Sequence, residues 1–402
     1  MYYLDEFIAK NVTKRPESMF LYDMGQNENI LTKKIADKSI LVIGGAGSIG
    51  SSFIKAVLPY RPKSLIVVDV NENALTELTR DLRSMSGIFM PNDYISYPMD
   101  YASEPFRKMF ISRSGFDIVA NFSAHKHVRS EKDIYSIEAL FLNNVLHAKE
   151  LLDLLSQYPP LEYFCVSTDK AANPVNIMGA SKRIMEDLIF SYSDSFPVTT
   201  ARFANVAFSN GSLPAGFLER IQKNQPLSAP MDVKRYFVSP EESGQICMLA
   251  CMLGKNREIF FPKLEKEQMM SFDEIARKLL KQQGYTILEC DSEEEAVDKA
   301  ERLKKGSRQY PVYFSVSDTS GEKPYEEFYT AEESVELNRF SALGVVTGKP
   351  RPDRSNLENI LNKLSNTFKK EDITKKDIVD VIKSYLLNFE HIETGRSLDN
   401  KL

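Results

Sequence analysis

The chain of 402 residues has no tryptophan and only four cysteines. Cys165 lies in an apolar strand-like run, and Cys247 and Cys251 lie in an apolar helix-like run. Since these cysteines have no neighbouring histidine or second cysteine pair, a metal site is not expected. We predict that they are small buried hydrophobic side chains.

Long apolar stretches are also missing. No run approaches the roughly 20 residues of a membrane span. The first residues, "MYYLDEFIAK", lack the basic start and continuous apolar core of a signal peptide. The net charge of −5 argues against nonspecific binding to nucleic acid. We therefore expect a cytoplasmic protein with neither a membrane nor a nucleic acid as partner.

Apolar strand-like runs alternate with helix-period segments from about residue 39. Nearly continuous apolar content is typical of parallel strands that are covered on both faces. The predicted strands are 39–44, 64–70, 94–99, 116–124, 161–167 and 198–206. The predicted helices are 48–58, 73–85, 131–156 and 177–192. This alternation predicts an α/β fold, a Rossmann-type doubly wound parallel sheet.

The pattern loosens after about residue 207, where proline and glycine become frequent. We predict an N-terminal arm (1–38), a dinucleotide-binding domain (39–206), a smaller C-terminal substrate lobe (207–349) and a helical extension (350–402). Part of the lobe is free to return to the first domain. Within the lobe, 272–284 and 291–306 are expected to be helices.

A glycine-rich turn follows the first predicted strand in "LVIGGAGSIGSS". Gly44, Gly47 and Gly50 are three residues apart, and Ser48 and Ile49 open the following helix. Such a turn lets the backbone approach a pyrophosphate, which the helix N-terminus also favours. The loop predicts a dinucleotide site, although a tight turn alone would also need glycine.

Acidic residues follow the second and third predicted strands. Asp69 lies 19 residues after Gly50 in the sequence, at the end of the second predicted strand. In dinucleotide-binding folds a carboxylate near this position accepts hydrogen bonds from the adenosine ribose. The same charge repels a 2′-phosphate, so NAD is favoured over NADP. Asp100 is either an adenine contact or an ordinary turn aspartate.

The segment "STDKAANPVNIMGASKR" (167–183), together with the glycine loop, resembles the extended short-chain dehydrogenases/reductases. It is most similar to the UDP-N-acetylglucosamine 4,6-dehydratases of polysaccharide biosynthesis. Further matching stretches are "AHKHV" (124–128), "RFANV" (202–206) with "GS" (211–212), "RYFVSPEE" (235–242) and "GEKPYEEF" (321–328).

The resemblance implies an NAD(P)-dependent dehydration of a UDP-sugar. It assigns Asp169 as the acid toward C6, Lys170 as the base toward C5 and Lys182 as the contact to the nicotinamide ribose. Both Asp169 and Lys170 would need partial burial to reach these protonation states near neutral pH. An ordinary surface Asp–Lys pair is the simpler alternative.

Met178 stands where many relatives have a proton-transferring tyrosine. The resemblance places it in a C5-retaining subgroup, in which the C4 proton leaves through Thr168 with an ordered water. Taken by itself, a methionine at this point is core filler.

The resemblance also implies UDP-sugar contacts from Lys126, Asn205, Ser212, Arg235 and Glu322. Arg235 is suited to pairing with diphosphate oxygens. Glu322 is either a uridine-ribose contact or a surface residue, and Arg202 is either a contact or structural. We expect a homo-oligomer, because extended members of the family commonly form dimers or larger rings.

Two other functions stay open at this stage. A nucleotide-sugar 4-epimerase needs only reversible oxidation at C4, but ordinarily relies on the tyrosine that is missing at 178. A non-enzymatic NAD(P)-binding sensor would bind the cofactor without turnover.

Overall fold

The computed structural model describes residues 4–304, 306–317, 325 and 327–392. Within this part of the chain, the largest sheet has nine strands in the order β15-β16-β11-β6-β5-β4-β1-β2-β3. The strands from β3 to β11 are parallel, and β16 and β15 add antiparallel pairs at one edge. Their bounds are β1 Ser39–Ile43, β2 Ser64–Asp69, β3 Asp93–Pro98, β4 Ile118–Asn121, β5 Glu162–Val166, β6 Val198–Ala201, β11 Glu258–Pro262, β15 Ser334–Glu336 and β16 Leu343–Thr347.

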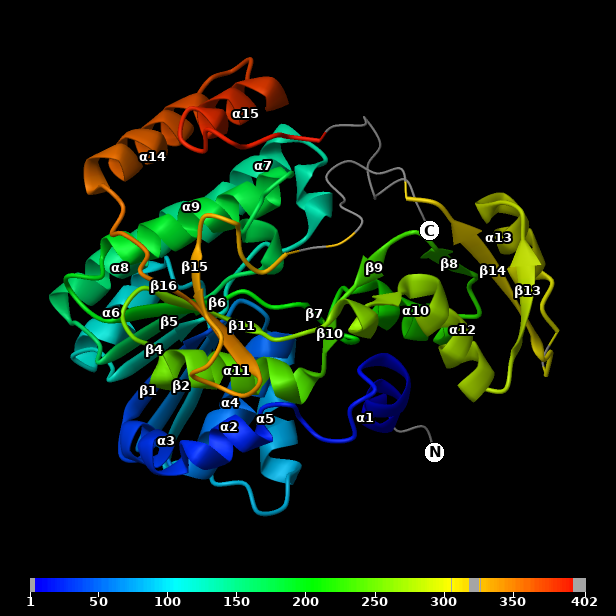
Figure 1. Ribbon diagram of the computed structural model, residues 1–402, viewed down its shortest axis with the longest axis horizontal. Helices are drawn as coiled ribbons and strands as arrows, with labels where there is room; N and C mark the ends of the chain where they lie inside the picture. The colour runs from blue at the N-terminus through cyan, green and yellow to red at the C-terminus, as the bar shows by residue number, and fades with distance from the viewer. Residues whose placement is uncertain (1–3, 305, 318–324, 326, 393–402) are drawn as a thin grey trace.

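Helices cover both faces of this sheet (Figure 1). On one face lie α2 (Leu21–Gln26), α3 (Glu28–Ile35), α4 (Ser48–Val57) and α11 (Pro240–Leu253). On the other lie α7 (Ile134–Phe141), α8 (His147–Gln157) and α9 (Ile177–Ser191). The crossovers on either side of β3 carry α5 (Glu72–Ser84) and α6 (Glu104–Ser112). The fold is therefore the predicted doubly wound α/β sheet, because strands that are apolar throughout need cover on both faces.

Side-chain caps define several helix starts. Asn71 and Ser103 accept hydrogen bonds from the first turns of α5 and α6. Ser239 and Glu242 form a reciprocal capping box at α11, with Pro240 in the first position. These caps satisfy backbone N–H groups that have no partner within the helix.

The lobe contains a three-stranded parallel sheet in the order β13-β14-β8. Its elements are α10 Leu213–Gln222, β8 Leu227–Pro230, α12 Phe272–Gln282, β13 Thr286–Cys290, α13 Glu293–Glu301 and β14 Gln309–Ser315. Two short pairs join it to the main body: β7 (Asn205–Val206) with β10 (Phe237–Val238), and β9 (Lys234–Arg235) with β12 (Met270–Ser271).

The N-terminal arm packs on both parts of the chain. Its first elements, α1 (Leu4–Phe7) and the π-helix η1 (Ile8–Val12), bury Phe7, Ile8 and Val12 in the lobe's own hydrophobic core. Further along, Arg15 pairs with Glu242 of α11 at 2.7 Å. The arm thus ties the lobe to the sheet.

The range predicted as a lobe, 207–349, also supplies β11, β15 and β16 to the main sheet. The predicted helix 131–156 is divided, because the π-helix η4 (Leu142–Leu146) separates α7 from α8. Short 3₁₀ turns are η2 (Leu58–Tyr60), η3 (Val128–Glu131), η5 (Asp169–Ala171) and η6 (Lys266–Gln268).

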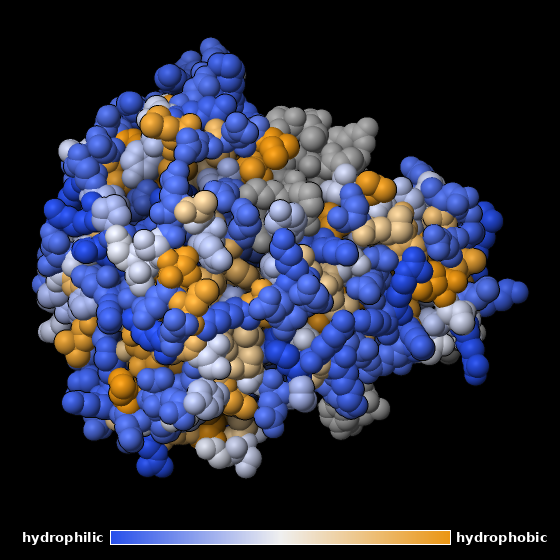
Figure 2. Space-filling model, viewed as in Figure 1, coloured by the Kyte–Doolittle hydropathy of each residue, from blue (hydrophilic) through white to orange (hydrophobic). Residues whose placement is uncertain are grey.

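The C-terminal extension forms α14 (Arg354–Phe368) and α15 (Lys375–Lys383), which lie outside α9 in Figure 1. All four cysteines are buried. Within the described ranges, no helix is both long and apolar enough to cross a bilayer. Figure 2 shows apolar residues in small groups on a mostly polar surface.

Candidate active site

The glycine loop joins β1 to α4. Gly44 has φ +70°, and a Cβ on it would lie 2.6 Å from the backbone nitrogen of Ser123, so only glycine fits there. Gly47 is the N-cap of α4 and has no side chain to bond the first turn of the helix. The first N–H groups of α4 are therefore available to a ligand.

Asp69 ends β2 next to this loop. Its Oδ2 accepts the Ala46 N–H at 3.1 Å, and its Oδ1 accepts the Asn71 N–H at 2.9 Å. The carboxylate therefore holds the glycine loop as well as facing the cavity. Asp100 follows β3, is exposed, and accepts the Ala102 N–H at 2.8 Å.

Three polar residues follow β5. Asp169 is 4% exposed, and its Oδ1 accepts hydrogen bonds from Thr168 Oγ1 at 2.8 Å and Lys170 Nζ at 3.1 Å. The Thr168 oxygen in turn accepts the Lys170 N–H at 3.4 Å. The hydroxyl, the carboxylate and the ammonium are thus joined through one carboxylate oxygen.

Met178 and Lys182 lie on α9, one turn apart. Gly179 allows this helix to approach η5, because a Cβ there would lie 2.6 Å from the Lys170 carbonyl oxygen. Lys182 is 3% exposed and donates to the Val166 carbonyl at 3.2 Å. Burial lowers the pKa of its ammonium group.

A buried ion-pair network supports the end of β5. Glu186 of α9 accepts the Ser167 hydroxyl at 2.6 Å and binds Arg202 through both carboxylate oxygens, at 2.8 and 2.6 Å. Arg202 also pairs with Glu333 at 2.7 Å, and the guanidinium holds the pKa of both carboxyls below the usual value against the opposing effect of burial. Arg202 is therefore structural, and it fixes the residue next to Thr168.

A cavity of about 1010 Å³ runs from the carboxyl edge of the main sheet to the lobe. Its volume is at the upper end of the range of ligand pockets, about 300–1,000 Å³, so it is large enough for a large ligand. The predicted residues that line it are Gly44, Gly47, Ser48, Ile49, Gly50, Asp69, Asp100, Lys126, Thr168, Lys170, Met178, Lys182, Asn205 and Ser212.

Two predicted residues do not line the cavity, and a third lies outside the described residues. Asp169 sits behind Thr168 and Lys170. Arg235 is 5% exposed in β9 and donates to the Lys234 carbonyl at 3.0 Å. Glu322 is the one outside the described ranges.

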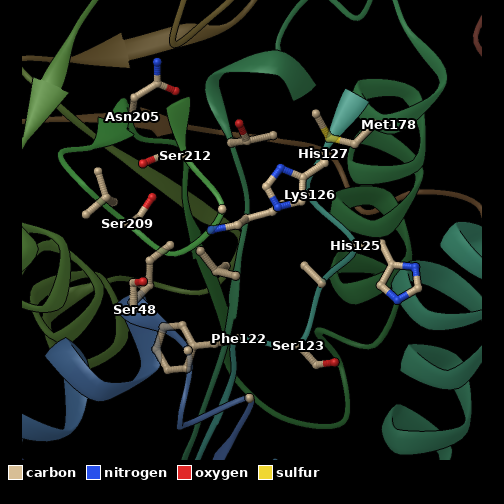
Figure 3. Close-up of a pocket in the computed structure, with 18 of the residues that line it drawn as sticks. Ser48, Phe122, Ser123, His125, Lys126, His127, Met178, Asn205, Ser209 and Ser212 are labelled. Carbon is tan, nitrogen blue, oxygen red and sulfur yellow. The ribbon is translucent and has the colours of Figure 1, made fainter. Parts of the chain in front are cut away.

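The loop after β4 crosses the middle of the cavity. Figure 3 shows Lys126 reaching toward the loop that carries Ser209 and Ser212, whereas His125 points away toward the helices. Burial lowers the pKa of Lys126. Burial, and next the charge of Lys182, also lower the pKa of His125.

The lobe contributes residues that the sequence reading missed, among them Arg220, Ser228 and Ser317. Arg220 lines the cavity with Leu213 and Gly216 of the same helix, at the i, i+3, i+7 spacing of one helical face. That periodicity, counted from Leu213 just after the predicted contact Ser212, was the signal that could have found Arg220.

The residues present fit the expected dinucleotide. A Cβ on Gly47 would meet no protein atom closer than the Gly44 carbonyl oxygen, at 3.4 Å, so this position opens onto the cavity. The uncapped turn of α4 suits a pyrophosphate, and Asp69 suits a ribose at the adjacent strand end.

The fold is that of the extended short-chain dehydrogenases/reductases. Pen from Bacillus thuringiensis aligns with a TM-score of 0.61 at 22% identity, over 79% of this chain and 90% of that one. UDP-glucose 4-epimerase from Thermotoga maritima, solved with UDP-glucose, aligns with a TM-score of 0.54 at 17% identity, over 73% and 90%.

The chain belongs to the polysaccharide biosynthesis protein family, whose pattern matches residues 40–346. An uncharacterised membrane protein of Methanocaldococcus jannaschii, MJ1061, is 29% identical over 87% of this chain and 97% of that protein. The probable polysaccharide biosynthesis protein EpsC of Bacillus subtilis is 27% identical over 75% of this chain, which spans about half of EpsC (47%). An inverting UDP-N-acetylglucosamine 4,6-dehydratase of Campylobacter jejuni is 24% identical, over 75% of this chain and 84% of that enzyme.

Proposed function

We propose that this chain is an NAD-dependent dehydratase that converts UDP-N-acetylglucosamine to UDP-2-acetamido-2,6-dideoxy-4-keto-hexose for polysaccharide or glycan biosynthesis. The observation that carries this proposal is the convergence of Thr168, Lys170, Met178 and Lys182 on the cavity that also contains the glycine loop. Family membership and the similarity to a 4,6-dehydratase support the reaction class.

Removal of the proton of the C4 hydroxyl is assigned to Thr168. Its hydroxyl already donates to Asp169 at 2.8 Å, so Thr168 can accept the sugar's proton while passing its own to the carboxylate. When bound, NAD⁺ would supply the redox chemistry at C4 and C6 of the sugar. Contact with the nicotinamide ribose is assigned to Lys182, which is 3% exposed and lines the cavity.

Removal of the C5 proton is assigned to Lys170, which must be a neutral amine to act as a base. Its Nζ lies 3.1 Å from the Asp169 carboxylate. Once Asp169 has taken the C4 hydroxyl proton its negative charge is gone, and Lys170 then releases one ammonium proton to solvent in the cavity and is free to take the C5 proton. The protonated Asp169 is then the source of the proton for the departing C6 hydroxyl, returned through the Thr168 hydroxyl because Asp169 does not line the cavity.

Met178 accounts for retention at C5 in this proposal. It is 2% exposed, lines the cavity and has no proton to donate. C5 is therefore reprotonated by Lys170 on the same face, after the ammonium protons have exchanged with solvent. A tyrosine at 178 would supply a second proton donor at this position.

Recognition of the UDP-sugar is assigned to Lys126, Asn205 and Ser212, with Arg220 as a cation toward the lobe. Ser212 also caps α10 by accepting the Ala215 N–H at 3.3 Å, so it has a structural role as well. Arg235 and Glu322 remain candidate contacts from the resemblance alone.

The test is incubation of the purified chain with NAD⁺ and UDP-N-acetylglucosamine in D₂O, followed by NMR. We expect a 4-keto-6-deoxy product with one solvent deuteron at C5 and the original C5 configuration. An inverted C5 would contradict the role given to Met178. UDP-N-acetylgalactosamine as the only product would instead identify a 4-epimerase, and cofactor binding without any product would identify a sensor.

A further inference from the structure

The C-terminal segment returns to the main body after α15. Phe389 is buried at 3% exposure, and its ring packs against that of His391, with centroids 6.0 Å apart. The Ile392 N–H donates to the Val175 carbonyl at 3.0 Å. Residues 389–392 therefore dock on the loop that leads from Lys170 to α9.

Glu131 contacts His391 of this segment. It is 5% exposed and ends η3, the turn that follows the Lys126 loop. Its Oε2 lies 3.3 Å from His391 Nε2, and its Oε1 accepts the Met178 N–H at 3.0 Å. One buried carboxylate thus joins the C-terminal segment to the helix of the active site.

The contact on α9 falls in its first turn. Asn176 caps the helix by accepting the Gly179 N–H at 2.7 Å, and Glu131 satisfies the neighbouring Met178 N–H. A carboxylate is favoured at a helix N-terminus, where the orphan N–H groups and the helix dipole meet. Glu131 therefore fixes the turn from which Met178 faces the cavity, with Lys182 one turn further along.

We propose that His391 is a positioning residue of the active site: by holding Glu131, it fixes the first turn of α9 and hence Met178 and Lys182. His391 lies beyond residues 40–346, so a segment outside the family match completes the catalytic centre. The effect on catalysis rests on the proposed function, whereas the coupling between the segment and α9 does not.

The experiment uses the full chain with His391→Ala and His391→Gln. Alanine removes the ring nitrogen that faces the Glu131 carboxylate, and glutamine provides an amide N–H donor in its place. We expect His391→Ala to lower kcat about 10-fold, within the roughly 100-fold that a 1 Å misplacement of reacting groups can cost. KM for the UDP-sugar should stay within about 2-fold, and His391→Gln should recover most of kcat. Leu387→Ser is the matched control, because Leu387 is 85% exposed on the same segment.

Hydrogen exchange of a peptide covering residues 175–182 is the second measurement, and it does not require turnover. We expect faster exchange there in His391→Ala and native exchange in His391→Gln and Leu387→Ser. Native kcat and native exchange in His391→Ala would overturn the proposal, as would a loss that glutamine does not restore. A native chain that is inactive on every UDP-sugar would refute the proposed function, and the exchange result would still decide the coupling.

Discussion

The two ends of the cavity are built in different ways. At the cofactor end, Gly44 and Gly47 follow β1, Asp69 ends β2, and two of these three residues are glycines without a side chain. At the lobe end, Arg220, Ser228 and Ser317 come from three separate elements: α10, β8 and the stretch beyond β14. The residues to which we assign the chemistry, at the end of β5 and on α9, lie between them.

The two ends also differ in how the expected residues relate to the cavity: those at the cofactor end come from the spacing of the glycine loop and the strand ends, whereas those at the lobe end come from the resemblance. Every predicted cofactor residue lines the cavity, whereas Arg235 does not and Arg220 takes a position there. A turn that binds phosphate through backbone N–H groups restricts the local sequence strongly. A cation for a diphosphate can come from any element that faces the site.

The largest effect is expected between the two ends, at Lys170. Lys170→Ala should lower formation of the 4-keto product by about 10²- to 10⁴-fold, the range for loss of a general acid or base. Affinities for NAD⁺ and UDP should remain native by calorimetry, because neither end is altered. Lys223→Ala, at an exposed lobe position, is the control. Unchanged turnover would remove Lys170 from the mechanism.

A substitution at Gly47 should affect only the cofactor end. Gly47→Val places carbon atoms in the space next to the uncapped turn of α4. We expect NAD⁺ affinity to fall about 10- to 100-fold, the equivalent of one or two charge-assisted hydrogen bonds, with native UDP affinity. Gly25→Val is the control, since a Cβ on Gly25 meets nothing within 4 Å. Equal losses of both ligands would show that the two ends are not separable.

The lobe end is tested by comparing two arginines. Arg220→Met should weaken UDP binding about 10-fold, the cost of one ionic hydrogen bond, while NAD⁺ binding stays native. Arg235→Met should change UDP binding by less than about 2-fold, because Arg235 lies outside the cavity. Thermal unfolding of both variants shows whether either substitution disturbs the fold. The reverse order of effects would restore Arg235 as the diphosphate contact.

The smallest effect concerns the choice of cofactor. Asp69→Asn removes the charge that repels a 2′-phosphate but keeps one oxygen to accept a backbone N–H. We expect the ratio of NAD to NADP affinity to fall about 5-fold, since the charge acts at a partly solvated site. Fluorescence titration of NADH and NADPH measures this ratio. An unchanged ratio would mean that Asp69 serves only to hold the glycine loop.

The bounds of particular elements show which features the sequence predicts well. The sequence predicts the bounds of β1, β2, β5 and α9 to within a residue or two at each end, because their apolar runs and caps are local signals. It read 131–156 as one helix, although a π-helical turn at Leu142–Leu146 divides it. It placed Asp169 beside Lys170 but did not find that the carboxylate sits behind the cavity wall, because burial depends on α9 packing over η5.

Sequence alone determined the doubly wound sheet, the glycine loop with Asp69, and the cluster from Thr168 to Lys182. These features lie within short stretches whose periodicity and spacing restrict the backbone directly. Only the tertiary structure decided that Arg220 rather than Arg235 lines the cavity, that β11, β15 and β16 extend the main sheet, and that His391 meets Glu131. Each of these depends on contacts between segments tens to hundreds of residues apart, and such contacts leave no local pattern in the chain.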